Sequence, residues 1–213
     1  ENSSSCLELI NDLERRGLPS SGLLFIVDGG SGLNKALNEK YRCDDRENRT
    51  AIRIRCHVHK WRNIEKALGD DSHKALGAFW AIRDAKDMAE AKVLSDRLES
   101  ILRSVNRSAL DSYLEAKDDL LAIHELKLSR NLKRFFSTTN AIESLNSMIG
   151  EDMRRVKLWR DSEHFQRWLA TYCLASEKRM RRIRGHASVA ALWVRLRTLT
   201  ERQDEIDSRE EVA

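Results

Sequence analysis

A run of five apolar residues that leads directly into an aspartate and three glycines constrains this chain more than any other feature. The run is Leu23–Val27, and Asp28-Gly29-Gly30-Ser31-Gly32 follows it. A short apolar run bounded by turn residues predicts a strand that is buried on both faces. Asp28 would then stand at the carboxyl end of that strand, where open α/β sheets bind their ligands. Because Asp-Gly is also a common turn pair, the alternative is that Asp28 simply opens a turn.

A second strand is predicted at 51–56, where apolar and charged residues alternate in Ala-Ile-Arg-Ile-Arg-Cys. The residues from 31 to 41 have the spacing of a helix, and this helix would connect the two strands. A strand, a helix and another strand in this order imply a parallel pair with a right-handed crossover. The sequence therefore predicts an α/β core.

Most of the remaining chain has a helical pattern. A first helix, capped among Ser3–Ser5, is predicted to end at Arg16-Gly17, and another occupies 57–68. From 72 to about 128 the apolar residues recur at helical spacing, which predicts an all-helical insertion of three or four helices. Nine glycines and one proline among 213 residues also suit a mostly helical protein.

A further helix start is predicted at Asn140, because Glu143 three places later completes a capping box. Ile142, Leu145 and Ile149 would then face a core. The following helix carries an apolar stripe and ends in a basic cluster, with Gly185 as its predicted C-cap. One more short helix at 190–199 and an acidic tail that we expect to fray complete the chain.

The charge is unevenly distributed along the chain. The net charge is only +4, but residues 152–186 hold ten Lys or Arg against four acids. Such a basic block indicates a polyanionic partner, with a solvated helix face as the alternative. Four cysteines without framework spacing favour a reduced intracellular setting, and no apolar run is long enough to span a membrane. The chain does not begin with Met, so we expect it to be a piece of a longer protein.

Three local motifs stand in a definite order along the chain. Asp28 follows the first strand, Cys56-His57-Val58-His59 with Arg62-Asn63 follows the second, and Thr138-Thr139-Asn140-Ala141-Ile142-Glu143 opens a helix beyond the insertion. In this combination the chain resembles the Mutator-type transposases, the DDE transposases of many bacterial insertion sequences. The resemblance implies that Asp28 is the second catalytic aspartate and Glu143 the catalytic glutamate. Cys56 and His59 match the family's Cys-x-x-His pair.

The same resemblance implies an RNase H-like catalytic core, interrupted by a helical insertion and incomplete at its N-terminus. The family's first catalytic aspartate belongs on an earlier strand, and Asp12 cannot replace it because it lies in a helical pattern. We therefore expect a C-terminal portion of a transposase, with little or no strand-transfer activity alone. The expected parts are core residues 1–68, the insertion 69–132, the rest of the core with basic helices at 133–186, and a C-terminal helix and tail at 187–213.

Carboxylates suit the implied chemistry. Phosphodiester cleavage and strand transfer use two Mg²⁺ (or Mn²⁺) ions, and hard cations prefer carboxylate oxygens. Asp28 and Glu143 are thus the expected metal ligands, with Asn140 in a supporting role. The alternative for Glu143 is a purely structural capping residue, because a side chain folded back onto the backbone of Asn140 turns away from a metal.

Cys56 and His59 admit two interpretations. His59 is a catalytic candidate that would approach the scissile phosphate or brace a ligand, with Cys56 supporting it; alternatively, the pair only packs past the strand. A structural zinc site is disfavoured because a single Cys-x-x-His lacks the second pair of ligands.

The expected partners are DNA, comprising the element ends and the target, and further copies of the same chain; no membrane is expected. The DNA-contacting candidates are Arg62, Asn63, Arg154, Arg155, Lys157 and Arg160. We expect a cytoplasmic, nucleoid-associated protein. The alternative function is a non-catalytic DNA-binding or assembly module, or a truncated regulatory transposase product.

Overall fold

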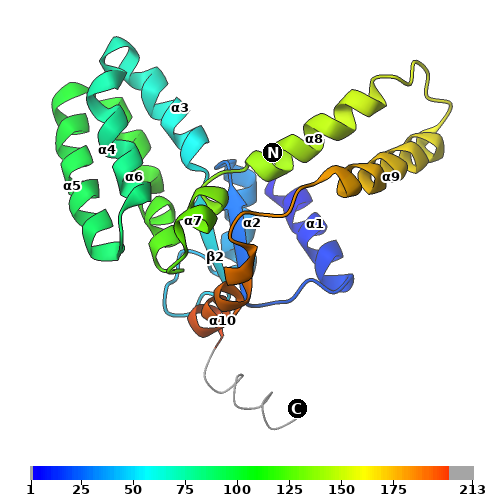
Figure 1. The fold of residues 1–213 in the computed structure, drawn as a ribbon, viewed down its shortest axis with the longest axis horizontal. Coiled ribbons are helices and arrows are strands. Elements are labelled where there is room, and N and C mark those ends of the chain that lie inside the picture. Colours follow the sequence, from blue (N-terminus) through cyan, green and yellow to red (C-terminus); the bar gives the residue numbers. More distant parts are fainter. Residues whose placement is uncertain (1, 202–213) are drawn as a thin grey trace, which may run out of the picture. The chain divides into compact units, whose positions relative to one another are not determined.

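The computed structural model describes residues 2–201 and is mostly helical (Figure 1). The chain divides into two compact units. The first comprises residues up to Thr138 together with those from Gly185 onward, and the second comprises 139–184. No helix within the described part of the chain is both long and apolar enough to cross a membrane. The predicted acidic tail lies beyond Glu201 and so outside the described residues.

The first unit is built on two strands. β1 (Leu23–Val27) and β2 (Ala51–Arg55) pair in parallel, with Leu23 opposite Ala51, and α2 (Ser31–Tyr41) connects them. The predicted strand–helix–strand arrangement is confirmed. The prediction that the first strand is buried on both faces was wrong for most of it, since only Val27 is fully buried. Within the described residues β1 pairs with β2 alone, so its other edge is not covered by a strand.

Alternating side chains of the strands supply two apolar clusters. One face packs against α1 (Ser3–Arg15) and α2 through Ile10, Val27 and Leu37. The other face, with Ile52 and Ile54, packs against α10 (Val189–Thr200). The helix predicted at 190–199 is therefore confirmed, and it covers the face of the sheet that carries Ile52 and Ile54. The first helix is capped one residue earlier than predicted, by the side chain of Asn2.

The helical pattern predicted from 72 to about 128 is confirmed for most of that region (Figure 1). The elements that follow residue 68 are η1 (Gly69–Ser72), α4 (His73–Asp84), α5 (Met88–Val105), α6 (Arg107–Leu121) and η2 (Ala122–His124). α3 (His57–Leu68), which was expected to belong to the core at 1–68, packs with these helices. They bury a core of their own around Phe79, Leu98 and Tyr113. Asp87 and Asn106 cap α5 and α6 by accepting backbone hydrogen bonds, which fixes where each helix begins. After the insertion, α7 (Arg130–Phe136) leads to the boundary of the unit.

The second unit is a hairpin of two helices, α8 (Asn140–Met153) and α9 (Ser162–Arg179) (Figure 1). The prediction that Ile142, Leu145 and Ile149 face a core was wrong, because α8 has no buried residue. A two-helix hairpin has too few layers to enclose a core of its own. The predicted C-cap was also wrong: α9 ends at Arg179, and Gly185 instead precedes η3 (His186–Ser188) in the first unit.

Candidate active site

Asp28 lies immediately after β1 and is exposed. Its Oδ1 accepts a hydrogen bond from the backbone N of Gly30 at 3.1 Å, so the residue does open a turn. Within residues 2–201 the second carboxylate oxygen makes no hydrogen bond. The turn and the ligand interpretations are thus compatible, because the turn holds one oxygen and leaves the other for a bound group.

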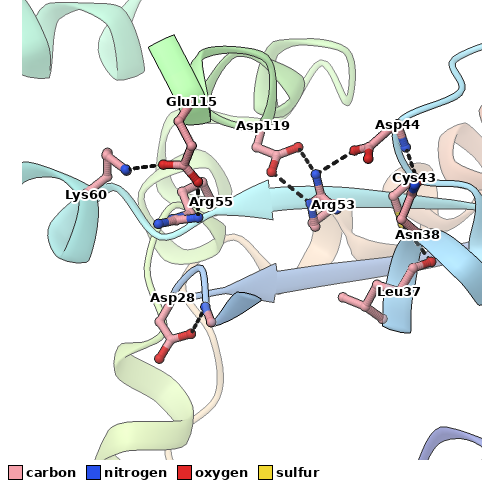
Figure 2. A network of polar contacts seen from close by, with 11 residues as sticks. Asp28, Leu37, Asn38, Cys43, Asp44, Arg53, Arg55, Lys60, Glu115 and Asp119 are labelled. Carbon is pink, nitrogen blue, oxygen red and sulfur yellow. Dashed lines mark hydrogen bonds and ion pairs between the residues drawn. The ribbon is translucent and has the colours of Figure 1, made fainter. Parts of the chain in front are cut away.

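The Cys-x-x-His motif begins beside Asp28. The backbone N of Cys56 donates to Val27 O at 2.7 Å, which continues the strand pairing up to the residue before Asp28. Cys56 is completely buried, and its Sγ lies 3.3 Å from His59 Nδ1. Figure 2 shows how closely the ends of the two strands and the start of α3 approach one another. The sequence motif therefore describes a real contact, located at the carboxyl end of the sheet.

Sequence reasoning missed an ionic cluster at the same place, built on Glu115, whose side chain is 54% exposed. Arg55, the last residue of β2, contacts Glu115 of α6 at 3.2 Å, and Lys60 of α3 contacts the other oxygen of Glu115 at 2.5 Å (Figure 2). Burial lowers the pKa of Lys60, although the hydrogen bond to Glu115 opposes this effect. The pKa of Glu115 is lowered: burial alone would raise it, but the hydrogen bond from Lys60 and the charge of Arg55 outweigh burial. Two buried cations thus share one carboxylate.

A second ionic group repeats this pattern one step along the strand. Arg53 donates two hydrogen bonds to Asp119, at 2.8 and 3.1 Å, and a third to Asp44 at 2.6 Å (Figure 2). These groups line a polar cavity of about 340 Å³ between β2 and α6. Two residues of strand advance about 6.6 Å and four residues of helix about 6 Å, so side chains at these intervals can pair in register. Arg53 and Arg55 alternate with isoleucines, and Glu115 and Asp119 are one helical turn apart, which is the signal that could have revealed the match.

Ser137, which precedes the Thr-Thr-Asn motif, is hydrogen-bonded to the segment that contains Cys56 and His59. The backbone N of His57, at the start of α3, donates to Ser137 O at 2.8 Å. His57 itself is buried, and burial followed by the charge of Arg83 lowers its pKa from 6.5 to about 3. The neutral imidazole is therefore a structural part of the core at neutral pH.

Glu143 lies in the first turn of α8, in the second unit. The helix begins one residue earlier than predicted for an Asn140 cap: Thr139 holds the N-cap position, and Asn140 is the first helical residue. The hydroxyl of Thr139 donates to Glu143 Oε1 at 2.5 Å. The Thr-Thr-Asn segment therefore orients the glutamate through a threonine hydroxyl four residues before it.

The predicted DNA-contacting residues are exposed. Arg62 and Asn63 lie on the exposed face of α3. The others, Arg154, Arg155, Lys157 and Arg160, occupy the connection between α8 and α9. Among the described residues only Arg155 of these four forms an ion pair, with Asp152 at 3.7 Å. Most of this positive charge is available to a polyanion.

Asp28 and Glu143 belong to different units, so their convergence on one site stays a prediction. Over residues 2–201, no three or more His, Cys, Asp or Glu side chains are grouped so that they could hold a metal ion. Each carboxylate is nevertheless exposed and of the type that a hard cation prefers.

Comparison with known proteins assigns the chain. The model of the family described as "Transposase, Mutator family" matches residues 1–180. The chain therefore belongs to the Mutator family of transposases. It is 30% identical over 158 residues to the transposase for insertion sequence element IST2 of Acidithiobacillus ferrooxidans, covering 74% of this chain and 50% of the relative. It is 26% identical over 172 residues to the transposase for insertion sequence element IS905 of Lactococcus lactis. This match covers 80% of this chain and 41% of the relative. The chain thus spans half or less of the length of these relatives.

Proposed function

We propose that this chain carries the catalytic part of an insertion-sequence transposase that cleaves and joins DNA by a two-metal DDE mechanism. The observation that supports this best is the carboxylate of Asp28, which is exposed in a hydrogen-bonded turn at the carboxyl end of β1. Membership of the Mutator family supports the same reaction class. The finer fold assignment, an RNase H-like core, rests on the parallel strand pair with its crossover helix and on the insertion that follows.

In this proposal Asp28 and Glu143 are metal ligands. Bound Mg²⁺ (or Mn²⁺) would stabilise the attacking and leaving oxygens of the phosphodiester. The turn at Gly30 and the hydroxyl of Thr139 each occupy one oxygen of a carboxylate, and so restrict the rotation of that carboxylate before a metal binds. His59, whose Nδ1 lies 3.3 Å from Cys56 Sγ, would contact a phosphate or brace a ligand.

DNA is the proposed substrate and partner, both as element ends and as target. The exposed residues between α8 and α9 would neutralise backbone phosphates without reading the sequence. The same proposal includes homo-oligomeric assembly, since two element ends must be cut and joined together. It also includes action on DNA at the cytoplasmic nucleoid.

The experiment is metal-dependent nicking of a labelled DNA duplex by the full-length product of the gene. Asp28→Asn and Glu143→Gln should each abolish nicking with Mg²⁺ and with Mn²⁺ while DNA binding persists. Glu151→Gln, a change to another exposed acid of α8, serves as the matched control and should nick like the wild type. If the wild type binds DNA and never cuts, or if both variants cut normally, the non-catalytic DNA-binding and assembly module replaces this proposal.

A further inference from the structure

Arg55 lies directly against the turn that carries Asp28. Gly29, the middle residue of that turn, has a φ of +100°, and a Cβ built on it would lie 1.6 Å from Cζ of Arg55. The backbone of Gly29 is therefore in close contact with the guanidinium group. Only glycine permits both this φ and this close approach.

The guanidinium of Arg55 is itself held in place from the helical insertion. Its side chain is 5% exposed, and Glu115 of α6 is its ion-pair partner. Within residues 2–201 the Nε of Arg55 makes no hydrogen bond. Glu115 also binds Lys60, whose Nζ donates to the backbone O of Ser112 at 2.9 Å. One carboxylate of the insertion thus fixes the side chain that supports the turn.

We propose that Arg55 is a positioning residue for Asp28, and that Glu115 of the helical insertion holds Arg55 in that role. The inference rests on the proposed function for its catalytic meaning, because the positioned group is the proposed metal ligand. It also gives the insertion a part in the active site: α6 supplies the anchor, although it carries no proposed catalytic residue. Disturbing α6 at Glu115 would loosen the Asp28 turn.

The variants to compare are Arg55→Lys and Glu115→Gln in the full-length protein. Lysine keeps the charge but loses the planar group that rests on Gly29, and glutamine keeps the shape of Glu115 but not its charge. The matched controls are Arg53→Lys and Asp119→Asn. These residues form the neighbouring ion pair between the same strand and the same helix, one step further from Asp28.

The first readout is amide hydrogen exchange, followed by mass spectrometry of peptides. We expect residues 28–32 to exchange about tenfold faster in Arg55→Lys and Glu115→Gln, while peptides from α5 exchange as in the wild type. The controls should leave residues 28–32 unchanged. A uniform acceleration in all peptides, or equal effects in the controls, would show that Arg55 stabilises only the fold and would overturn the inference.

The second readout is the affinity for Mn²⁺ alone, measured by calorimetry. Loss of a group that orients a metal ligand typically weakens the metal by about tenfold, which is the effect expected for both variants. If the wild type binds no Mn²⁺, the proposed two-metal function fails, and the exchange result still decides whether Arg55 positions the turn. If Mn²⁺ binds equally to wild type and variants while exchange is unchanged, the positioning role is wrong and the proposed function stands.

Discussion

His124 and Lys133 meet inside the first unit, with Lys133 Nζ 3.4 Å from His124 Nδ1. The other ring nitrogen of His124 lies 2.8 Å from Ile82 O, and Lys133 also donates to Ala85 O at 2.5 Å. Both side chains are buried. This geometry suits a neutral imidazole that donates through Nε2 and accepts through Nδ1.

The pair predicts acid sensitivity. Burial, and next the charge of Lys133, lower the pKa of His124 from 6.5 to about 4. Below pH 6.5 the unfolded chain therefore binds a proton that the folded chain does not. The free energy of unfolding then decreases as the pH is lowered from 6.5 to about 4. By pH 5 this amounts to about 2 kcal/mol. Glutamine can make the same two contacts without titrating, so His124→Gln should lose about 2 kcal/mol less than the wild type between pH 7 and pH 5 in denaturant unfolding.

The control for this prediction is His186→Gln, because His186 is exposed. Its stability should follow the wild-type pH dependence. Equal pH dependence in His124→Gln and the wild type would contradict the assignment of His124 as a buried neutral group.

Cysteine accessibility makes a second prediction. Cys43 and Cys56 are buried, whereas Cys173 is exposed. Burial also raises the pKa of Cys43 to about 11, so its reactive thiolate is scarce at neutral pH. A brief treatment of the native protein with iodoacetamide should therefore modify Cys173 and spare the other two, as read by peptide mass spectrometry. Unfolding in urea should make all of them react; early modification of Cys56 in the native protein would contradict its placement in the core.

The basic connection between α8 and α9 makes a third prediction. Replacing Arg154, Lys157 and Arg160 by alanine should weaken DNA binding uniformly across sequences. Each lost phosphate contact should also reduce the slope of log affinity against log salt by about one. The triple change Lys92→Ala, Arg97→Ala and Arg103→Ala, on exposed positions of α5, is the control with equal loss of charge. If both triple variants bind alike, net charge rather than this segment determines affinity.

Local patterns were sufficient to predict the strands, the crossover helix and the helices that follow the second strand, because strand and helix periodicities differ clearly in these segments. The motifs around Asp28 and Cys56 were also placed correctly at the carboxyl ends of the two strands. The expected core of α8 failed because an apolar stripe does not specify its partner: Ile142 is 53% exposed. The Arg55–Glu115 contact joins residues 60 apart in the chain and requires knowing that α6 lies along β2. No local pattern carries that information.

The central claim is that Asp28 and Glu143 hold catalytic metal ions, and metal rescue tests it most directly. Sulfur is a poor ligand for Mg²⁺ and a better one for Mn²⁺, so Asp28→Cys and Glu143→Cys should lose DNA nicking with Mg²⁺ and regain part of it with Mn²⁺. Asp28→Ala and Glu143→Ala should stay inactive with both metals. We expect rescue in the cysteine variants alone. Full activity of either cysteine variant with Mg²⁺, or equal Mn²⁺ activity in the alanine variants, would contradict the assignment of these carboxylates as metal ligands.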